Sequence, residues 1–171
     1  MSQIIPKNSI INKSIKKLDY FDSFETVIPK QENYSIDYLT AKLFTSTPNW
    51  VIKLLSLRDL IVEPFDLKTG KDKTINKIDK NIIYDIGSKA LFFTVLTKNE
   101  NEIVLSEDDK HLYFRTSVLK EDFEDKLKIH LTTIVIYHNF FGKFYFFFVK
   151  PFHRIIMRAM LNLLKKSGIE K

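Results

Sequence analysis

Cysteine is absent from this sequence of 171 residues. The chain therefore forms no disulfide bond and offers no thiolate to a metal ion, which excludes cysteine-based zinc and iron–sulfur sites. A protein without disulfides is typical of a reducing compartment, so we expect a cytoplasmic location.

Long hydrophobic runs are also missing. The longest, at positions 144–149, ends at Lys150 and is far shorter than the roughly 20 residues that span a bilayer. The first ten residues, MSQIIPKNSI, lack the continuous apolar stretch of a signal peptide. We therefore expect neither a transmembrane segment nor a secretion signal.

Arginine is scarce, since only four of the 27 basic residues are arginine, and most of the lysines are scattered singly. The net charge of +6 would favour a polyanionic partner. Arginine, however, is the residue that binds phosphates and base edges through two hydrogen bonds at once. We therefore predict no nucleic-acid partner.

Recognised metal-binding and catalytic motifs are lacking as well. The histidines are His111, His130, His138 and His153. No two of them have the close spacing of a zinc-binding pair, so we expect no metal ion and no other cofactor. Nor is there a nucleophile elbow, a glycine-rich phosphate loop or a zincin motif, so no catalytic residue can be named.

Hydrophobic periodicity predicts an α+β chain of one domain at 18–171, preceded by a loosely attached polar arm at 1–17. Period-two alternation predicts strands at 18–28, 82–86, 90–97, 102–106, 112–119 and 127–138. Short polar segments, including 120–125, separate the later strands and predict antiparallel hairpins.

Two short helices are predicted between the first two strands. Ser35 is placed as an N-cap for a helix at 36–45. Thr47 and Pro48 begin a second helix that contains Trp50, followed by a polar loop at 68–80. Trp50 is predicted to pack in the core more readily than to stack on a ligand.

The segment 142–166 is predicted to form one long C-terminal helix around which the rest of the chain is organised. A helical wheel gives an apolar stripe of Tyr145, Phe148, Phe152, Ile155, Ile156, Ala159 and Leu163. The opposite stripe is Lys143, Lys150, Arg154, Arg158 and Lys165. Both stripes keep their phase across Pro151, which predicts a kinked but continuous helix. The alternative is a strand at 144–149 followed by a helix that begins at Pro151.

This wheel also predicts which side of the helix is buried. Phe152 lies at the centre of the apolar stripe, so its replacement by alanine should cost about 3–5 kcal/mol of stability. Replacement of Arg154 on the opposite stripe should cost far less. Curved antiparallel strands that wrap this helix are the predicted partner of its apolar side.

Four segments resemble the uncharacterised DUF2867 family. They are DYFDSF at 19–24, TSTPNWVIKLLSLRDLIVEPFDLKT at 45–69, SEDDKHLYFRTSV at 106–118 and HNFFGKFYFFFVKPFHRIIMRAML at 138–161. The resemblance implies the START/Bet v 1-like (SRPBCC) superfamily and its helix-grip fold, in which an apolar or amphipathic ligand lies between sheet and C-terminal helix. Tyr113 and Lys143 depart from the family pattern, which has an acidic residue and an arginine at these places.

The predicted strand at 112–119 carries a polar row. His111, Tyr113, Arg115 and Ser117 share one face because side chains alternate along a strand. This row is either the solvent face of a half-buried strand or the polar lining of a ligand pocket. In the second case Arg115 would need an acidic partner, because a buried cation is costly unless it is paired.

The leading hypothesis is a protein that binds a hydrophobic or amphipathic small molecule in a cavity between sheet and C-terminal helix. The candidate ligand-binding residues are His111, Tyr113, Arg115, His138, Trp50, Phe148 and Phe152. One alternative is a polyketide-cyclase-like enzyme that uses the histidines and arginine of that cavity. The other is association with a membrane surface through Phe146, Phe147 and nearby basic residues. The sequence indicates no oligomeric state.

Overall fold

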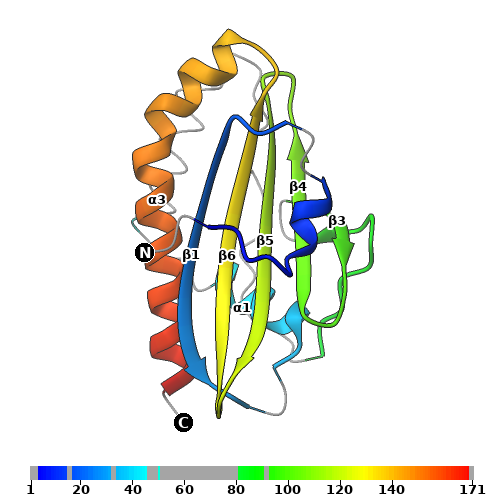
Figure 1. Ribbon diagram of the computed structural model, residues 1–171, viewed down its shortest axis with the longest axis vertical. Helices are drawn as coiled ribbons and strands as arrows, with labels where there is room; N and C mark the ends of the chain where they lie inside the picture. The colour runs from blue at the N-terminus through cyan, green and yellow to red at the C-terminus, as the bar shows by residue number, and fades with distance from the viewer. Residues whose placement is uncertain are drawn as a thin grey trace.

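A computed structural model of the chain describes residues 4–14, 17–31, 34–45, 50, 81–90 and 93–169. These residues form a six-stranded antiparallel sheet with a long C-terminal helix beside it (Figure 1). The strands are β1 (Tyr20–Pro29), β2 (Lys89–Ala90), β3 (Phe93–Lys98), β4 (Glu102–Asp108), β5 (Leu112–Phe123) and β6 (Lys126–Tyr137). Their order across the sheet is β1-β6-β5-β4-β3-β2, so the first strand pairs with the last. The α+β class is confirmed, and the arrangement is compatible with a helix-grip fold.

The hairpin between β5 and β6 is tighter than the sequence predicts. Phe123 pairs with Lys126, which leaves two residues for the turn, and Glu124 there has a φ of 56°. The predicted polar segment at 120–125 is therefore wrong in extent, because most of it continues the β5 ladder.

The predicted strand at 82–86 is wrong. Ile83 and Ile86 are largely exposed there, and the chain reverses before it can pair with a neighbour. Ser88 donates its backbone N–H to the carbonyl of Asp85, and Gly87 adopts a φ of 85° that favours glycine. Hydrogen bonds to Val95 of β3 begin just after this segment, at Gly87 and Ser88, and β2 itself begins at Lys89.

Two α-helices are described in full. The helix α1 (Ile36–Thr45) has the predicted bounds, and the hydroxyl of Ser35 accepts a hydrogen bond from the N–H of Tyr38 as a helix cap. The helix α3 (Phe140–Ile169) continues through Pro151, so the continuous helix is confirmed and the strand alternative is wrong. The second predicted helix, which begins at Thr47 and Pro48, and the loop predicted at 68–80 lie outside the described residues, apart from Trp50.

The helices α1 and α3 cover one face of the sheet and form the main core with it. Leu39 of α1 and Leu164 of α3 are buried in the same cluster as Leu105 and Leu131 of the sheet. Figure 1 shows α3 running along the whole length of β1, with its first turns leaning towards the end of β6.

The N-terminal arm covers the opposite face. Figure 1 shows it crossing the strands to a short 3-10 helix, η1 (Ile10–Ser14), that lies over β4. Ile11 is fully buried against Val104 and Ile134. The buried carboxylate of Glu102 accepts hydrogen bonds from the Ser9 hydroxyl at 2.6 Å and from the Ile10 N–H at 2.7 Å. The arm is therefore held firmly, contrary to the loose attachment predicted.

The buried side of α3 differs from the predicted one, although Ile156 of the predicted stripe packs against the edge of the core. The residues that face the core are Phe146, His153, Met157, Met160, Leu161 and Leu164. Phe148, Phe152 and Ile155 are each about half exposed. The wheel failed because α3 is apolar on two sides, and the sheet packs against the side that also carries His153.

Candidate ligand site at the N-terminal end of α3

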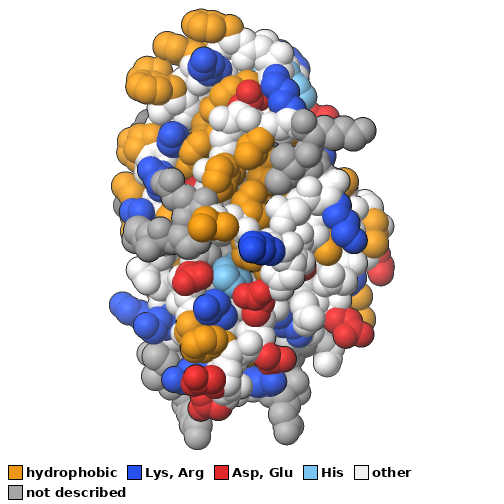
Figure 2. Space-filling view, viewed as in Figure 1, with side chains coloured by type: hydrophobic (Ala, Val, Ile, Leu, Met, Phe, Trp, Pro, Cys, Tyr) orange, Lys and Arg blue, Asp and Glu red, His pale blue; other side chains and the backbone are white. Residues whose placement is uncertain are grey.

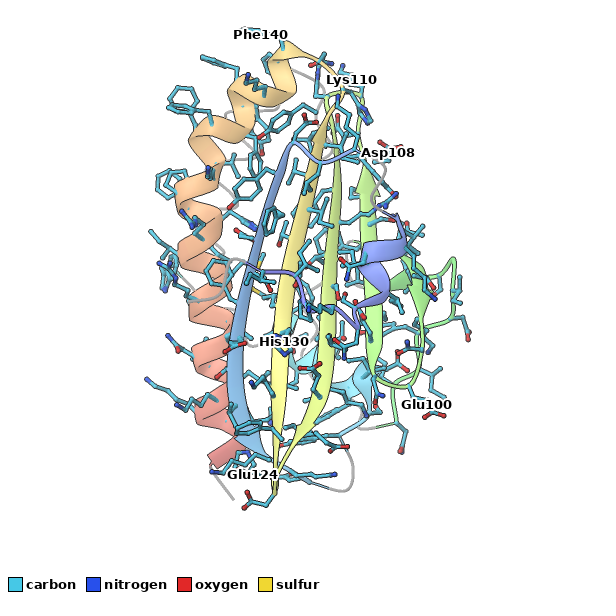
Figure 3. All side chains as sticks on the ribbon, in the orientation of Figure 1. Glu100, Asp108, Lys110, Glu124, His130 and Phe140 are labelled. Atoms are coloured by element: carbon cyan, nitrogen blue, oxygen red, sulfur yellow. The ribbon has the colours of Figure 1, made fainter. Side chains whose placement is uncertain are left out.

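A hollow lies where the end of β6 meets the first turns of α3. It has a volume of about 280 Å³. Its lining consists of Tyr137, Phe140, Lys143, Phe144, Phe146, Phe147 and Lys150. Most of these residues recur at helical spacings of three and four, so one side of α3 supplies nearly the whole wall. Figure 3 places Phe140 at this end of the molecule.

The floor of the hollow is aromatic and rigidly packed. Phe146 is only 3% exposed. Its ring lies 4.8 Å from the ring of Tyr20 and 5.9 Å from that of Tyr137. Flat rings held by several neighbours give a preformed apolar surface for a ligand.

The rim of the hollow is positively charged. Lys143 and Lys150 lie on it, and α3 contains no aspartate or glutamate along its 30 residues. The ammonium of Lys150 is 4.8 Å from the centre of the Tyr20 ring, an attractive cation–π contact. The N-terminal end of the helix adds a further partial positive charge. The site therefore favours an anionic group beside an apolar one.

Behind Phe146 lies a buried polar cluster between the sheet and α3. Tyr20 donates its hydroxyl to Asp22 Oδ2 at 2.6 Å. Nε2 of His153 is 3.2 Å from the Thr133 hydroxyl and 3.5 Å from Asp22 Oδ1. Asp22, Thr133 and His153 are all at least nine-tenths buried. Desolvation by burial, reinforced by the hydrogen bond to Asp22, raises the pKa of Tyr20 well above its ordinary value.

This cluster is incompletely satisfied. Asp22 Oδ1 accepts no hydrogen bond from the described residues. Nε of Arg154 is also buried and donates no hydrogen bond to them. A buried carboxylate oxygen without a donor is costly. The hydrogen bond that Tyr20 donates to the other oxygen, Oδ2, therefore contributes strongly to the stability of the folded state. The ring of His153 lies 6.4 Å from that of Phe146, which connects the cluster to the floor of the hollow.

A corner at the same end fixes where α3 begins. The side chain of Asn139 accepts a hydrogen bond from the N–H of Gly142 at 3.0 Å and donates one to the carbonyl of Lys110 at 3.1 Å. A Cβ atom at Gly142 would overlap the backbone carbonyl of His111. The helix can approach the β4–β5 turn this closely only with glycine at that position, and this contact sets the direction in which the first turns project.

The model of the family described as "Protein of unknown function (DUF2867)" matches residues 14–160. The chain belongs to this family. No curated protein and no solved structure matches it. The DUF2867 segments at 19–24 and 138–161 supply Tyr20, Asp22 and His153 to the buried cluster, and the latter also supplies most of the hollow.

His111 and His138 meet at the corner rather than in the interface between sheet and helix. The ring of His111 is 4.7 Å from that of Phe141, and its backbone carbonyl accepts the N–H of His138. Nε2 of His138 is 2.9 Å from Asp108 Oδ1. Figure 3 shows Asp108 and Lys110 at this end of the sheet. Within the described part of the chain, no cluster of three or more histidines and acids could hold a metal ion.

Tyr113 and Arg115 lie on the face of the sheet that points away from α3. The register pairs Arg115 with Ile134, which is buried under the N-terminal arm, whereas Phe114 faces His153. The guanidinium of Arg115 stacks over the Tyr113 ring at 4.4 Å. Of the two alternatives for this polar row, the lining of a pocket beside α3 is therefore not the one that the structure shows.

The predicted aromatic ligand residues are also outside the hollow. Trp50 is 45% exposed, so the predicted core packing is wrong. Phe148 and Phe152 point outward from α3. Of the residues that the sequence singled out for membrane association, Phe146 forms the floor and Phe147 a wall.

Sequence reasoning missed the buried cluster, although signals for it were present. Asp22 alternates with Tyr20 and Phe24 on a strand face that is mostly apolar, where an acid needs a partner. His153 recurs with Phe146, Met157 and Met160 at helical spacing, a period that marks the buried side.

A second hollow of about 280 Å³ lies between the N-terminal arm and the sheet. Nε2 of His130 is 2.6 Å from Glu121 there, and its Nδ1 is 3.6 Å from Glu25. Burial alone would raise the pKa of Glu121, but the hydrogen bonds from Asn8 and His130 outweigh it and lower that pKa. This polar group attaches the N-terminal arm to the sheet, because Asn8 donates a hydrogen bond to Glu121 of β5, which also contacts His130 of β6. Figure 3 shows His130 about midway along the sheet, far from α3's first turns.

Proposed function

We propose that this protein binds an amphipathic small molecule with an acidic head group at the N-terminal end of α3. The apolar part of the ligand lies against the aromatic walls, and its acidic group pairs with Lys143 and Lys150. The observation that carries the proposal is the lining itself: five aromatic side chains, two lysines and no acid.

The chemistry of the lining supports an acid over a neutral molecule. Neither lysine forms an ion pair with a carboxylate of the described residues, so both ammonium groups can accept a new anionic partner. A charge-assisted hydrogen bond to such a partner is about twice as strong as a neutral one. The site lies at the end of the interface between sheet and α3, because Met157, Met160 and Leu164 fill its middle.

The helix-grip assignment within the START/Bet v 1-like superfamily belongs to the same proposal. It is supported by the antiparallel order of the strands and by the packing of α3 along the sheet. The cyclase alternative has less support, because His111 and His138 lie at the corner and Arg115 on the other face.

Displacement of 1-anilinonaphthalene-8-sulfonate, followed by fluorescence, tests the proposal with decanoate and decanol as competitors. Decanoate should bind more tightly than decanol. The double variant Lys143→Gln, Lys150→Gln should weaken decanoate binding about tenfold or more and leave decanol unchanged. The matched control is Lys165→Gln, Lys166→Gln, which removes the same charge from the far end of α3. Equal affinity for the two competitors, or unchanged decanoate binding in the first variant, would refute the proposal.

A further inference from the structure

The outer side of the first half of α3 is a continuous apolar ridge. Its members are Phe140, Phe144, Phe147, Phe148, Phe152 and Ile155, whose exposed fractions range from 49% to 82%. The rings of Phe144 and Phe148 lie 5.1 Å apart, and those of Phe147 and Phe148 lie 5.3 Å apart. Phe144, Phe147 and Phe148 at the centre of the ridge are therefore packed against one another rather than isolated, and contiguous exposed apolar surfaces mark interaction sites.

Only positive charges flank this ridge on α3. Lys143, Lys150 and Arg154 follow one another along its side, and the helix has no acidic residue to offset them. Figure 2 shows blue basic groups alternating with orange apolar groups along the edge formed by α3. An apolar strip beside a basic row is the pattern of helices that lie in the interface of an anionic membrane.

We propose that this ridge docks on the surface of an anionic lipid bilayer, with α3 lying in the plane of the interface. The ridge runs from Phe140 to Ile155, about 22 Å at 1.5 Å per residue. The aromatic side chains enter the boundary of the acyl chains, and the flanking lysines contact lipid phosphates. No helix of the described residues is long and apolar enough to cross a membrane, which agrees with a helix that lies on the surface.

A second copy of the chain fits the ridge less well than lipid does. Two identical ridges packed together would bring two basic rows close to each other, and like charges across an interface are unfavourable. A lipid phosphate instead supplies the negative charge that α3 lacks.

The ridge and the hollow share Phe140, Phe144 and Phe147. Docking would therefore place the mouth of the hollow at the bilayer, so that an acidic amphiphile could enter without crossing water. This route for the ligand rests on the proposed function, whereas the docking itself rests on the ridge and its charges.

Flotation with phospholipid vesicles tests the inference on the full-length chain. The protein should float with vesicles of phosphatidylcholine and phosphatidylglycerol, bind phosphatidylcholine alone much more weakly, and dissociate as salt is added. Each lysine in contact with the surface should contribute about a fivefold gain in affinity. The variant Phe152→Ser, Ile155→Ser removes ridge side chains that do not line the hollow, and it should bind about tenfold more weakly or worse.

The matched control is Ile83→Ser, Ile86→Ser, which removes two exposed isoleucines from outside α3. It should float like the unmodified protein, and equal melting temperatures would show that all variants are folded. Failure to float with anionic vesicles, or equal flotation of the ridge variant, would overturn the inference. So would a dimer in light scattering, without lipid, that the ridge variant abolishes.

Decanoate displacement on the same samples separates this inference from the proposed function. Decanoate binding without flotation would refute the docking and leave the ligand site intact. Flotation without decanoate binding would refute the ligand site and leave the docking intact.

Discussion

Phe146 and Phe152 are the same residue type on one helix, six positions apart, and the structure assigns them opposite roles. Phe146 is 3% exposed and touches the rings of Tyr20 and Tyr137. Its replacement by alanine removes a buried ring and leaves a cavity, which costs about 3–5 kcal/mol of unfolding free energy. We expect the upper part of that range, since each aromatic pair adds about 0.5–1.5 kcal/mol beyond burial.

Phe152 is 49% exposed, so its replacement removes only about half of the transfer free energy of a phenylalanine. Full burial is worth about 1.5–3 kcal/mol, and Phe152→Ala should therefore cost about 1 kcal/mol. Urea titrations followed by circular dichroism measure both values, and equal slopes would show that the two variants unfold from comparable states. Equal losses for Phe146→Ala and Phe152→Ala, or a larger loss for Phe152→Ala, would refute the assignment of the buried side of α3.

Three further predictions concern single contacts. Gly142→Ala should lower the melting temperature by several degrees because the new methyl group displaces the carbonyl of His111, whereas alanine at an ordinary helical position would stabilise by up to about 1 kcal/mol. Tyr20→Phe should cost about 1–3 kcal/mol in urea titrations because it leaves the carboxylate of Asp22 without its donor, and a neutral result would show that this cluster is solvated. The pKa of Glu121 is lowered by folding, so its contribution is complete above the ordinary value of 4.5 and is lost as the pH falls through the lowered value. Glu121→Gln should therefore flatten the decline of the urea midpoint in that acid range, and an unchanged decline would contradict the reasoning.

The strand predictions succeeded where the pattern is local. The β4, β5 and β6 ladders follow period-two alternation bounded by polar turns, and alternation reflects a sheet with different surroundings on its two faces. The segment at 82–86 has the same alternation but no partner, because the turn at Gly87 reverses the chain first. Pairing is a property of two segments, so one segment's pattern could not exclude it.

The candidate site was less predictable than the fold. The sequence indicated an aromatic and basic helix end, and the hollow is built from it. The sequence also drew attention to Arg115 and His111, which lie respectively on the other face and at the corner. Tyr20 and His153 are far apart in the chain, and only the antiparallel pairing of β1 with β6 under α3 brings them together.

The sequence by itself determined the α+β class, the family, the continuity of α3 through Pro151 and the one-sided charge of that helix. The class, the helix continuity and the charge follow from composition and from short-range periodicity, which a linear chain displays directly, whereas the family follows from the resemblance of whole sequence segments. Only the tertiary structure decided which side of α3 is buried. Both sides are apolar, so the helical wheel does not indicate which of them is buried. The buried side is the one that packs Phe146, Met157 and Leu164 against the sheet and places His153 within hydrogen-bond distance of Thr133. That choice leaves Phe148, Phe152 and Ile155 on the outside, where they form the proposed docking ridge.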